Sequence, residues 1–489
     1  MTTAVVVGSG PNGLAAAVRL AQAGVAVRVL EAEPGIGGGA RSVRRPAPGG
    51  LAGQLIFDEC SAFHPMAVAS PFLASLGLER HGLRWRWPEV QLAHPLDGGR
   101  AGLLYRDPGR TAEGLGGDGK AWDAIIGATA RRFEQLVPDI LGPLLRVPRH
   151  PLALVRFGAL AALPATVLAK AWRHDEARAL FGGVAAHSFA SLNAPFSSSV
   201  GLVLSAAAHA VGWPVPEGGT QAISDALAAR LRELGGTIET GKRLGRVGEA
   251  GEPDLLLLCV SPQAAASILD GRLPAAVGRS YRSYRYGPAA FKVDYTIRGE
   301  VPWEAPDVRL AGTVHLGGTI EEIARAEEQN VRGSMPERPF VLVGQQYAAD
   351  PSRSADGVNP LWAYAHVPHG YPGDATEAIT AQIERFAPGF RDRILSVSVR
   401  SVAALEGHNA NYVGGDISTG ANSGLQIVFR PRLTSDPYST GVPGVFLCSA
   451  ATPPGGGVHG MAGFHAAERA LAYLRRRGAS RLPAETRIE

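Results

Sequence analysis

The sequence predicts an α/β protein of two interleaved domains. One has a parallel sheet between helices, and the other is an α+β domain with an antiparallel sheet and helices. Three observations predict this fold class. A strand, a glycine turn and a helix open the chain, and the same arrangement returns near its end. Segments with the alternating pattern of antiparallel strands lie between the two. The length of 489 residues suits two or three domains.

Composition limits the kind of protein. Hydrophobic residues make up 45% of the chain and charged residues 19%, which allows a sizeable core and excludes wholesale disorder. The net charge is only +4, and the arginines are scattered, so we expect no nucleic-acid partner. Cys60, Cys259 and Cys448 form no C-x-x-C pair, which argues against a redox dithiol and a disulfide framework. We expect a cytoplasmic protein without a signal peptide or a metal site.

The first element is a short apolar strand, Ala4–Val7, followed by a glycine turn, a helix that closes at Gly24, and a second strand, 25–30, ending in Glu31. This order within about 30 residues predicts a Rossmann-type dinucleotide site. The three glycines would allow a tight turn, close approach of a pyrophosphate, and close helix–strand packing. Glu31 suits ribose hydroxyls and disfavours the 2′-phosphate of NADP. The predicted ligands here are Gly8, Ser9, Gly10, Pro11, Asn12, Gly13, Glu31 and Ala32.

A second glycine cluster, 35–39, follows Glu31 directly. NAD dehydrogenases do not need glycines here, whereas FAD proteins run this loop along the diphosphate and ribityl chain. We therefore expect Gly38 and Gly39 to contact FAD, and Arg41 either to pair with a phosphate oxygen or to lie on the surface. The sequence resembles the FAD-dependent phytoene desaturase and amine oxidase superfamily, whose members carry this fold followed by a Gly-Gly-x-x-Arg-Ser/Thr loop.

The middle of the chain divides by pattern. Residues 51–120 are expected to be loops and short strands inserted into the sheet domain, and residues 121–212 are mainly helical. Within the latter, the apolar segment 138–172 is interrupted by prolines and cannot span a bilayer, which takes about 20 apolar residues. It is a core helix pair, a lid, or a membrane-surface helix with arginine rims.

The chain then returns to the parallel sheet, with strands expected near 235–240 and 254–260. The resemblance implies that backbone near Leu244 meets the adenine. Residues 285–405 contain alternating strands such as Phe291–Ile297, which are typical of an antiparallel sheet. The predicted FAD-binding domain is therefore discontinuous (1–120, 213–280 and 425–489), and it is interleaved with a substrate domain (121–212 and 281–424).

The C-terminal motif is a strand at 444–452, a glycine turn at 453–460 and a helix from Gly463. Glycines entering a helix let the backbone lie against a planar ring, with amides directed at the side where a reduced flavin is negative. The two motifs together predict one non-covalent FAD held at both ends. Its ring end would meet Ala451, Gly457, Val458 and His459.

Details of this motif resemble bacterial relatives of the pyridine nucleotide-disulfide oxidoreductase domain-containing protein 2 family, over nearly the whole chain. The cysteine pattern gives no support to the word "disulfide" in that name.

Two residues are candidates for catalysis. His459 would hold flavin O2 or the substrate, or relay a proton near pH 7; the alternative is a structural role at the turn. Lys292 lies on a strand where amine-oxidising relatives place a lysine near N5; the alternative is an ordinary strand lysine.

The leading functional prediction is dehydrogenation, as desaturation or isomerisation, of a small apolar or amphipathic organic substrate by hydride transfer to flavin N5. One alternative is an amine oxidase acting on a C–N bond. Another is a non-catalytic lipid-binding or chaperone protein, such as the Rab escort proteins that share this fold. Since a second Rossmann motif for NAD(P)H is lacking, oxygen, a quinone or another acceptor would re-oxidise the flavin. If segment 138–172 is a membrane-surface helix, the protein would also have peripheral contact with a membrane.

Overall fold

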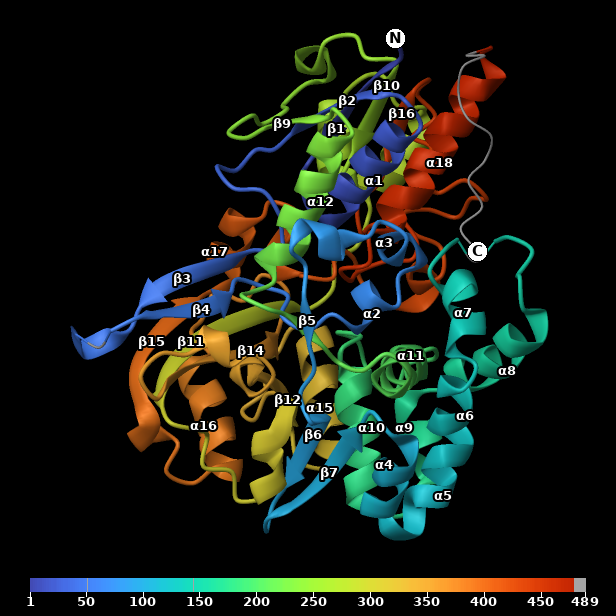
Figure 1. The fold of residues 1–489 in the computed structure, drawn as a ribbon. Coiled ribbons are helices and arrows are strands. Elements are labelled where there is room, and N and C mark those ends of the chain that lie inside the picture. Colours follow the sequence, from blue (N-terminus) through green and yellow to red (C-terminus); the bar gives the residue numbers. More distant parts are fainter. Residues whose placement is uncertain (51, 144, 479–489) are drawn as a thin grey trace.

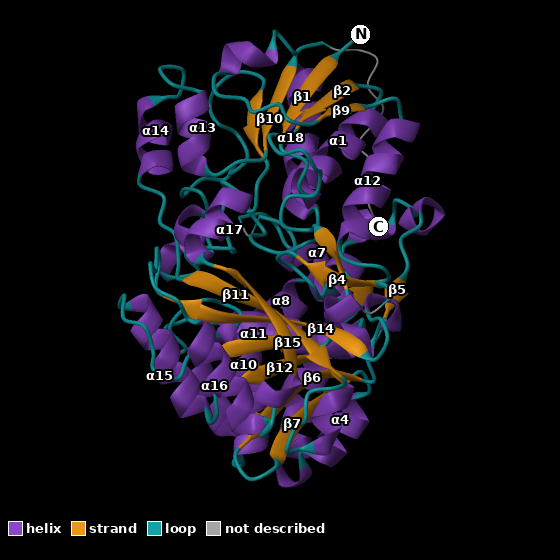
Figure 2. Cartoon of the chain, turned by 90° about the vertical axis from the view of Figure 1, so that its left-hand side faces the viewer, coloured by secondary structure: helices purple, strands orange, loops and turns teal. Residues whose placement is uncertain are grey.

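The computed structural model describes residues 1–50, 52–143 and 145–478. The chain forms two sheet-based bodies stacked end to end, and segments from the beginning, middle and end of the sequence build the upper one (Figure 1). Figure 2 shows the two sheets separated by a layer of loops. The predicted fold class, a split Rossmann-type domain joined to an α+β domain, is confirmed.

The upper sheet is parallel and has the strand order β16-β10-β1-β2-β9. Its strands are β1 (Thr3–Val7), β2 (Ala26–Leu30), β9 (Thr237–Glu239), β10 (Leu255–Leu258) and β16 (Val445–Leu447). The central strands β1 and β10 are nearly continuous apolar runs because helices cover both of their faces.

Three helices cover one face of this sheet: α1 (Pro11–Gln22), α12 (Gln221–Glu233) and α18 (Met461–Arg476). Helices α13 (Pro262–Ile268) and α14 (Ala275–Arg282) cover the other. A Cβ added at Gly463 of α18 would lie 1.7 Å from the carbonyl oxygen of Asn12 in α1. The helices that follow the two glycine turns therefore pack side by side (Figure 1).

The lower sheet has seven strands in the order β15-β11-β14-β13-β12-β6-β7. They are β6 (Val90–Leu96), β7 (Arg100–Tyr105), β11 (Ala289–Arg298), β12 (Ala311–Leu316), β13 (Val341–Gly344), β14 (Val358–Val367) and β15 (Ile394–Arg400). Every neighbouring pair is antiparallel except β12 and β6. Helices α10 (Asp175–Ala186) and α11 (Ser198–Ala210) belong to the core on one face, and α16 (Thr376–Phe386) packs on the other.

One predicted boundary is wrong. Residues 90–105 were expected in the FAD-binding domain, but β6 pairs with β12 and β7 pairs with β6, so both belong to the lower sheet. Helix α4 (Pro108–Gly114) follows β7 and packs against it. The first segment of the upper domain therefore ends before β6 and not at residue 120. The pairing of β6 with β12 joins strands more than 200 residues apart in sequence, which no local pattern can reveal.

The apolar segment 138–172 begins at the end of α7 (Phe133–Ile140) and contains α8 (Pro151–Ala161) and α9 (Ala165–Leu168). Its outer side is exposed, so this segment is not wholly a core element. Within the described residues, no single helix is both long and apolar enough to cross a bilayer. Only α8 and the stretch 165–171, counted together, are long and apolar enough, and the chain bends by 93° between them.

Candidate functional site

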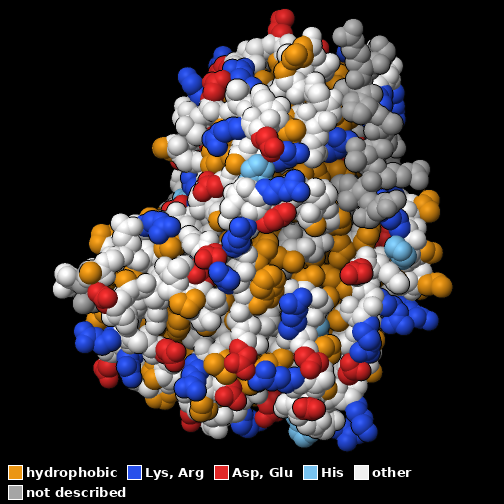
Figure 3. Space-filling model, viewed as in Figure 1, with side chains coloured by type: hydrophobic (Ala, Val, Ile, Leu, Met, Phe, Trp, Pro, Cys, Tyr) orange, Lys and Arg blue, Asp and Glu red, His pale blue; other side chains and the backbone are white. Residues whose placement is uncertain are grey.

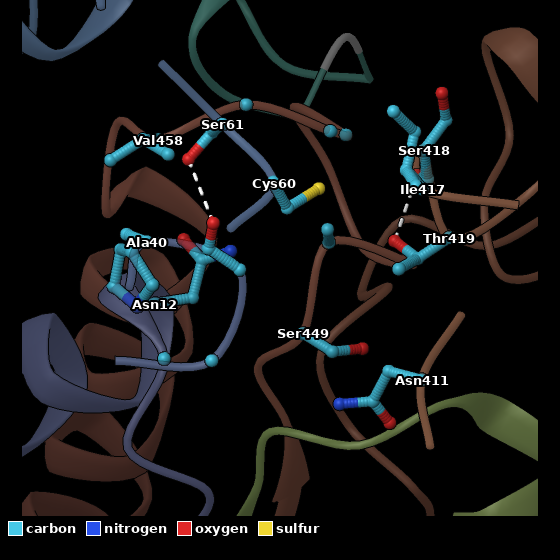
Figure 4. A pocket seen from close by; sticks show the side chains of 18 of the residues that line it. Asn12, Ala40, Cys60, Ser61, Asn411, Ile417, Ser418, Thr419, Ser449 and Val458 are labelled. Atoms are coloured by element: carbon cyan, nitrogen blue, oxygen red, sulfur yellow. Dashed lines mark hydrogen bonds between the residues drawn. The ribbon is translucent and has the colours of Figure 1, made fainter. Parts of the chain in front are cut away.

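A single cavity of about 690 Å³ extends from the carboxyl ends of the upper sheet to the lower sheet. The first glycine turn, the loop at 38–41 and residues near Leu244 line its upper end. Asn12 of α1 and Val458 of the C-terminal loop both line this cavity (Figure 4). Ser61, Asn411 and Ser449 also border this space (Figure 4). A ligand site at the carboxyl edge of a doubly wound sheet agrees with the general rule for such folds.

The first glycine turn has the geometry that the sequence predicted. Gly8 has a φ of +98°, a left-handed conformation that favours glycine. A Cβ on Gly13 would lie 2.0 Å from the carbonyl oxygen of Gly8, so only glycine permits this approach of helix to strand. Gly10 differs, since its Cβ would meet only the Cα of Gly38, at 3.9 Å. Gly10 borders the cavity and caps α1 without a side chain, which leaves helix amides for a ligand phosphate.

Glu31 lies at the end of β2 and is 7% exposed. One carboxylate oxygen accepts a hydrogen bond from the backbone N–H of Ser9, at 2.8 Å, and the other from Glu33 N–H, at 2.9 Å. These bonds aim the carboxylate at the upper end of the cavity, which Glu31 lines together with Ala32. Each oxygen of a carboxylate accepts more than one hydrogen bond, so capacity for ribose hydroxyls remains.

The second glycine loop is built onto the first. The backbone N–H of Gly37 donates to the carbonyl of Ser9, at 3.2 Å. A Cβ on Gly38 would lie 3.1 Å from the Cα of Gly10, and one on Gly39 would overlap the hydroxyl of Tyr412. Ser61 donates from its hydroxyl to the carbonyl of Gly39, at 2.9 Å (Figure 4). The two loops thus form one glycine-lined wall of the cavity.

Arg41 follows this wall and lines the cavity. Its Nε lies 3.4 Å from a carboxylate oxygen of Glu59, and its terminal nitrogen donates to the carbonyl of His408, at 2.8 Å. Of the two alternatives for Arg41, a free surface arginine does not fit, because its side chain is only 12% exposed.

The C-terminal turn forms another part of the cavity wall. Residues 455–459 line the cavity, and Gly460, with a φ of +68°, leads into α18 without a capping side chain. The Nδ1 of His459 accepts the backbone N–H of Met461, at 3.0 Å. The neutral imidazole therefore carries its proton on Nε2, which is buried and has no hydrogen-bond partner among the described residues. Burial lowers the pKa of His459 to about 4.

These features fit FAD at both ends. The Oδ1 of Asn12 and the Nε2 of His459 are buried polar atoms without partners in the part of the chain described, and both residues line the cavity. Buried polar atoms are nearly always paired, so such orphans indicate a bound polar group. The glycine wall and the amides of α1 suit a diphosphate, and the turn before α18 suits a planar ring.

Most of the predicted FAD ligands line the cavity. They are Gly8, Gly10, Pro11, Asn12, Glu31, Ala32, Gly38, Gly39, Arg41, Leu244, Gly457, Val458 and His459. Ser9, Gly13 and Ala451 are not among the lining residues. Ser9 and Gly13 support the lining residues from behind, because Ser9 binds Glu31 and Gly13 packs against Gly8. Ala451 is fully buried.

The lower end of the cavity is apolar and aromatic. Thr313, Leu342, Trp362 and Tyr364 line it from β12, β13 and β14, which are neighbours in the sheet. Phe189 stacks on Tyr364, with ring centroids 6.1 Å apart and planes 8° apart. Further apolar residues come from α7, α8 and α11. This end suits the burial of an apolar substrate.

Charges in the cavity are unevenly distributed. Among the described lining residues the only carboxylates are Glu31 and Glu33, at the nucleotide end. Arg430 borders the opposite part and is 3% exposed. Its guanidinium donates to the side-chain oxygen of Asn422 and the backbone oxygen of Gln426, and neither acceptor is charged. A cationic substrate would therefore find a buried guanidinium in the cavity wall, because the carboxylate near that guanidinium, Asp416, is fully buried and does not line the cavity.

Lys292 of β11 is not among the lining residues. Its ammonium pairs with the carboxylate of Asp294, and both side chains are less than 5% exposed. Burial lowers the pKa of Lys292, while the Asp294 carboxylate acts in the opposite direction. Neither predicted alternative describes it, since it points neither into the cavity nor to solvent.

Sequence reasoning missed much of the wall. Loop residues 60–63, 65–66, 409–412, 417–419 and 422 line the cavity, as does Trp213, whereas His64 and His187, which also line it, were predicted as pocket residues. The loops carry no periodic signal. The aromatic residues Trp362 and Tyr364 do carry a periodic signal, because positions i and i+2 of a strand face the same side.

Comparison with known proteins agrees with this architecture. Residues 6–70 match the NAD(P)-binding Rossmann-like domain family. Over 95% of its length the chain is 25% identical to pyridine nucleotide-disulfide oxidoreductase domain-containing protein 2 of Mus musculus, of which 92% is covered. The resemblance to that group is thereby confirmed.

Solved structures share the whole fold. An oxidoreductase from Methanosarcina mazei superposes with a TM-score of 0.62 and 17% identity, covering 96% of this chain and all of the other. Wild-type putrescine oxidase bound to putrescine gives a TM-score of 0.58 and 18% identity, covering 97% and 99% of the two chains. The chain therefore has the fold of these oxidases, with a dinucleotide-binding domain at its N-terminus.

Proposed function

We propose that this chain is an FAD-dependent oxidoreductase that either dehydrogenates an apolar or amphipathic organic substrate to a desaturated product or isomerises it. The observation that carries the proposal is the continuous cavity, which has two glycine loops at one end and an aromatic wall at the other. Bound FAD would supply the acceptor for a hydride from a substrate C–H bond. The chain supplies the binding, orientation and exclusion of water.

Each end of the cavity has a separate task in this proposal. Glu31 and the amides of α1 hold the nucleotide, while the turn at 455–459 holds the ring. The Nε2–H of His459 donates a hydrogen bond to the ring or to the substrate. Since its pKa is about 4, His459 stays neutral near pH 7 and acts as a fixed donor. Re-oxidation by oxygen, a quinone or another acceptor completes the turnover.

The charges around the aromatic wall favour a neutral or anionic substrate over an amine. A protonated amine is stabilised by a carboxylate, yet the carboxylates that line the described cavity are confined to its nucleotide end. The buried guanidinium of Arg430 would repel such a substrate. Amine oxidation would be compatible with the fold, but the substrate end of the cavity has no carboxylate among its described lining residues to match a protonated amine.

Anaerobic bleaching of the purified flavoprotein tests this proposal. Long-chain alkenes, polyenes and their carboxylates are mixed with the protein in the absence of oxygen, and primary amines and polyamines are mixed in parallel. We expect bleaching with a member of the first group, no bleaching with amines, and no rapid reduction by NADH or NADPH. Bleaching by an amine would replace the proposal with amine oxidation. A protein that cannot be loaded with FAD would favour a non-catalytic lipid-binding role.

A further inference from the structure

The outer side of α8 and the loop before it carry an exposed apolar surface. Leu145 and Val147 of the loop are 49% and 90% exposed, and Leu152 and Val155 of α8 are 77% and 69% exposed. We call these four residues the α8 surface. Exposed large hydrophobic residues are usually scattered singly, so four within eleven positions indicate a binding surface.

Helical spacing places the exposed residues of α8 on one side. Leu152, Val155, Ala159 and Ala162 follow each other at intervals of three and four residues, and all are exposed. Ala153 and Ala161, on the opposite side, are buried. The inner and outer sides of helix α8 are therefore both apolar, and among the described residues only the inner side is covered by the protein.

The charged residues of the segment that carries this surface all have one sign. Between residues 140 and 174 the sequence contains no aspartate or glutamate. The basic residues of this stretch are Arg146, Arg149, Arg156, Lys170 and Arg173, all exposed. Figure 3 shows orange and blue side chains next to each other at the right-hand edge, where Figure 1 places α7 and α8. A surface of this composition matches an interface with apolar chains beneath anionic headgroups.

The cavity reaches the same region from within. Ile140, Leu141 and Gly142 at the end of α7 line it, as does Phe157 of α8. Val200, Val203 and Leu204 of α11 line the cavity beside them. Helix α8 thus stands between the apolar end of the cavity and the exposed α8 surface.

We propose that the α8 surface docks the protein on an anionic lipid bilayer, with Leu145, Val147, Leu152 and Val155 in the interface and the neighbouring arginines at the headgroups. Docking there brings the apolar end of the cavity to the bilayer, from which an apolar substrate can enter. The docking itself does not depend on the proposed redox chemistry.

Vesicle co-sedimentation of the FAD-loaded full-length chain tests the proposal. The vesicles contain either phosphatidylcholine alone or phosphatidylcholine with phosphatidylglycerol. The test variant is the double substitution Leu152→Glu and Val155→Glu. The control is Val397→Glu and Val399→Glu on β15, which makes the same charge change at two other exposed valines, 46% and 45% exposed. Circular dichroism, thermal unfolding and FAD content verify that both variants are folded.

The expected result has three parts. The wild type binds vesicles with phosphatidylglycerol more tightly than pure phosphatidylcholine, and added salt weakens that binding. The α8 variant loses binding by about tenfold or more, because it places two charges in the interface. The β15 control loses much less.

Three results would overturn the proposal. One is the absence of wild-type binding to either vesicle at low salt. Another is an equal loss in the two variants, which would mean that only net charge matters. The third is a wild type that self-associates through the α8 surface and binds no vesicles, which would make a second copy of the chain the partner. Because vesicle binding is measured without substrate, its failure is distinct from a failure of the redox proposal.

Discussion

The substitution Gly10→Ala separates cofactor binding from folding. Gly10 has a φ of −64° and a ψ of 169°, which any residue can adopt. Its Cβ would meet only the Cα of Gly38, at 3.9 Å, an ordinary van der Waals contact. The added methyl group therefore finds room in the protein. It lies, however, where a diphosphate must approach the amides of α1.

The magnitude follows from the hydrogen bonds at risk. A hydrogen bond between a backbone N–H and a charged group contributes about 1.5–3 kcal/mol. Losing one such bond to a phosphate oxygen weakens FAD binding by roughly ten- to a hundredfold, since 1.4 kcal/mol corresponds to a factor of ten. The free energy of unfolding of the FAD-free protein should change by less than about 1 kcal/mol, as at other substitutions that make no new close contacts.

Titration of FAD into the FAD-free protein, followed by flavin fluorescence, measures the affinity, and chemical unfolding of the same protein measures stability. Two further alanine substitutions serve as controls. Gly35→Ala has no atom within 4 Å of its Cβ and should change neither quantity. Gly13→Ala would place its Cβ 2.0 Å from the carbonyl oxygen of Gly8 and should lower stability by about 1–3 kcal/mol or more.

The reasoning fails if Gly10→Ala binds FAD as tightly as the wild type while Gly35→Ala does too. The amides of α1 would then not hold the diphosphate. It also fails if Gly10→Ala destabilises the FAD-free protein as much as Gly13→Ala, because the position would then be packed rather than open.

Three other predictions concern the site and its surroundings. Glu31→Gln should weaken FAD binding by about tenfold, since it removes a charged acceptor from the ribose hydroxyls, and isothermal titration would show an unchanged affinity if that role is wrong. Lys292→Met should lower the free energy of unfolding in urea by up to about 3 kcal/mol because Asp294 loses its buried partner and keeps only Arg45, 3.2 Å away. It should leave anaerobic flavin reduction nearly unchanged, and a large loss of rate with normal stability would reassign Lys292 to the reaction. Acid should destabilise the protein, because burial lowers the pKa of His64, His94, His459 and His465 to about 4 from 6.5. Between these pH values the unfolded chain binds protons that the folded chain does not, so stability falls as pH falls, by roughly 4 kcal/mol per unit near pH 5. A stability that is flat from pH 7 to pH 5 would contradict this.

The upper domain was predictable because its signals are local. The strand, turn and helix that surround Gly8 and Gly13 occupy one short stretch, and each glycine has a steric reason that a sequence reader can infer. The C-terminal turn at 455–460 repeats the pattern. Their meeting was predicted from the chemistry of one extended ligand, and the contact between Gly463 and Asn12 now gives it a physical basis.

The lower domain was less predictable because its contacts are distant in sequence. The prediction placed residues 90–105 in the wrong domain because the pairing of β6 with β12 has no local signal in the sequence. Lys292 was a candidate for catalysis because of its strand position, yet Asp294 on the same strand pairs with its ammonium group. The burial of Arg430 beside the cavity depends on the fold and has no signal in the local sequence.

The central claim is that one FAD spans the two glycine loops. The most direct measurement is the release of the cofactor from the purified protein by heat or acid, followed by mass spectrometry and quantitation per chain, for the wild type and Gly10→Ala. We predict FAD as the released compound, close to one per chain in the wild type, and a reduced content in Gly10→Ala. A wild-type protein that releases NAD or NADP instead, or that stays colourless after incubation with excess FAD, would contradict the claim.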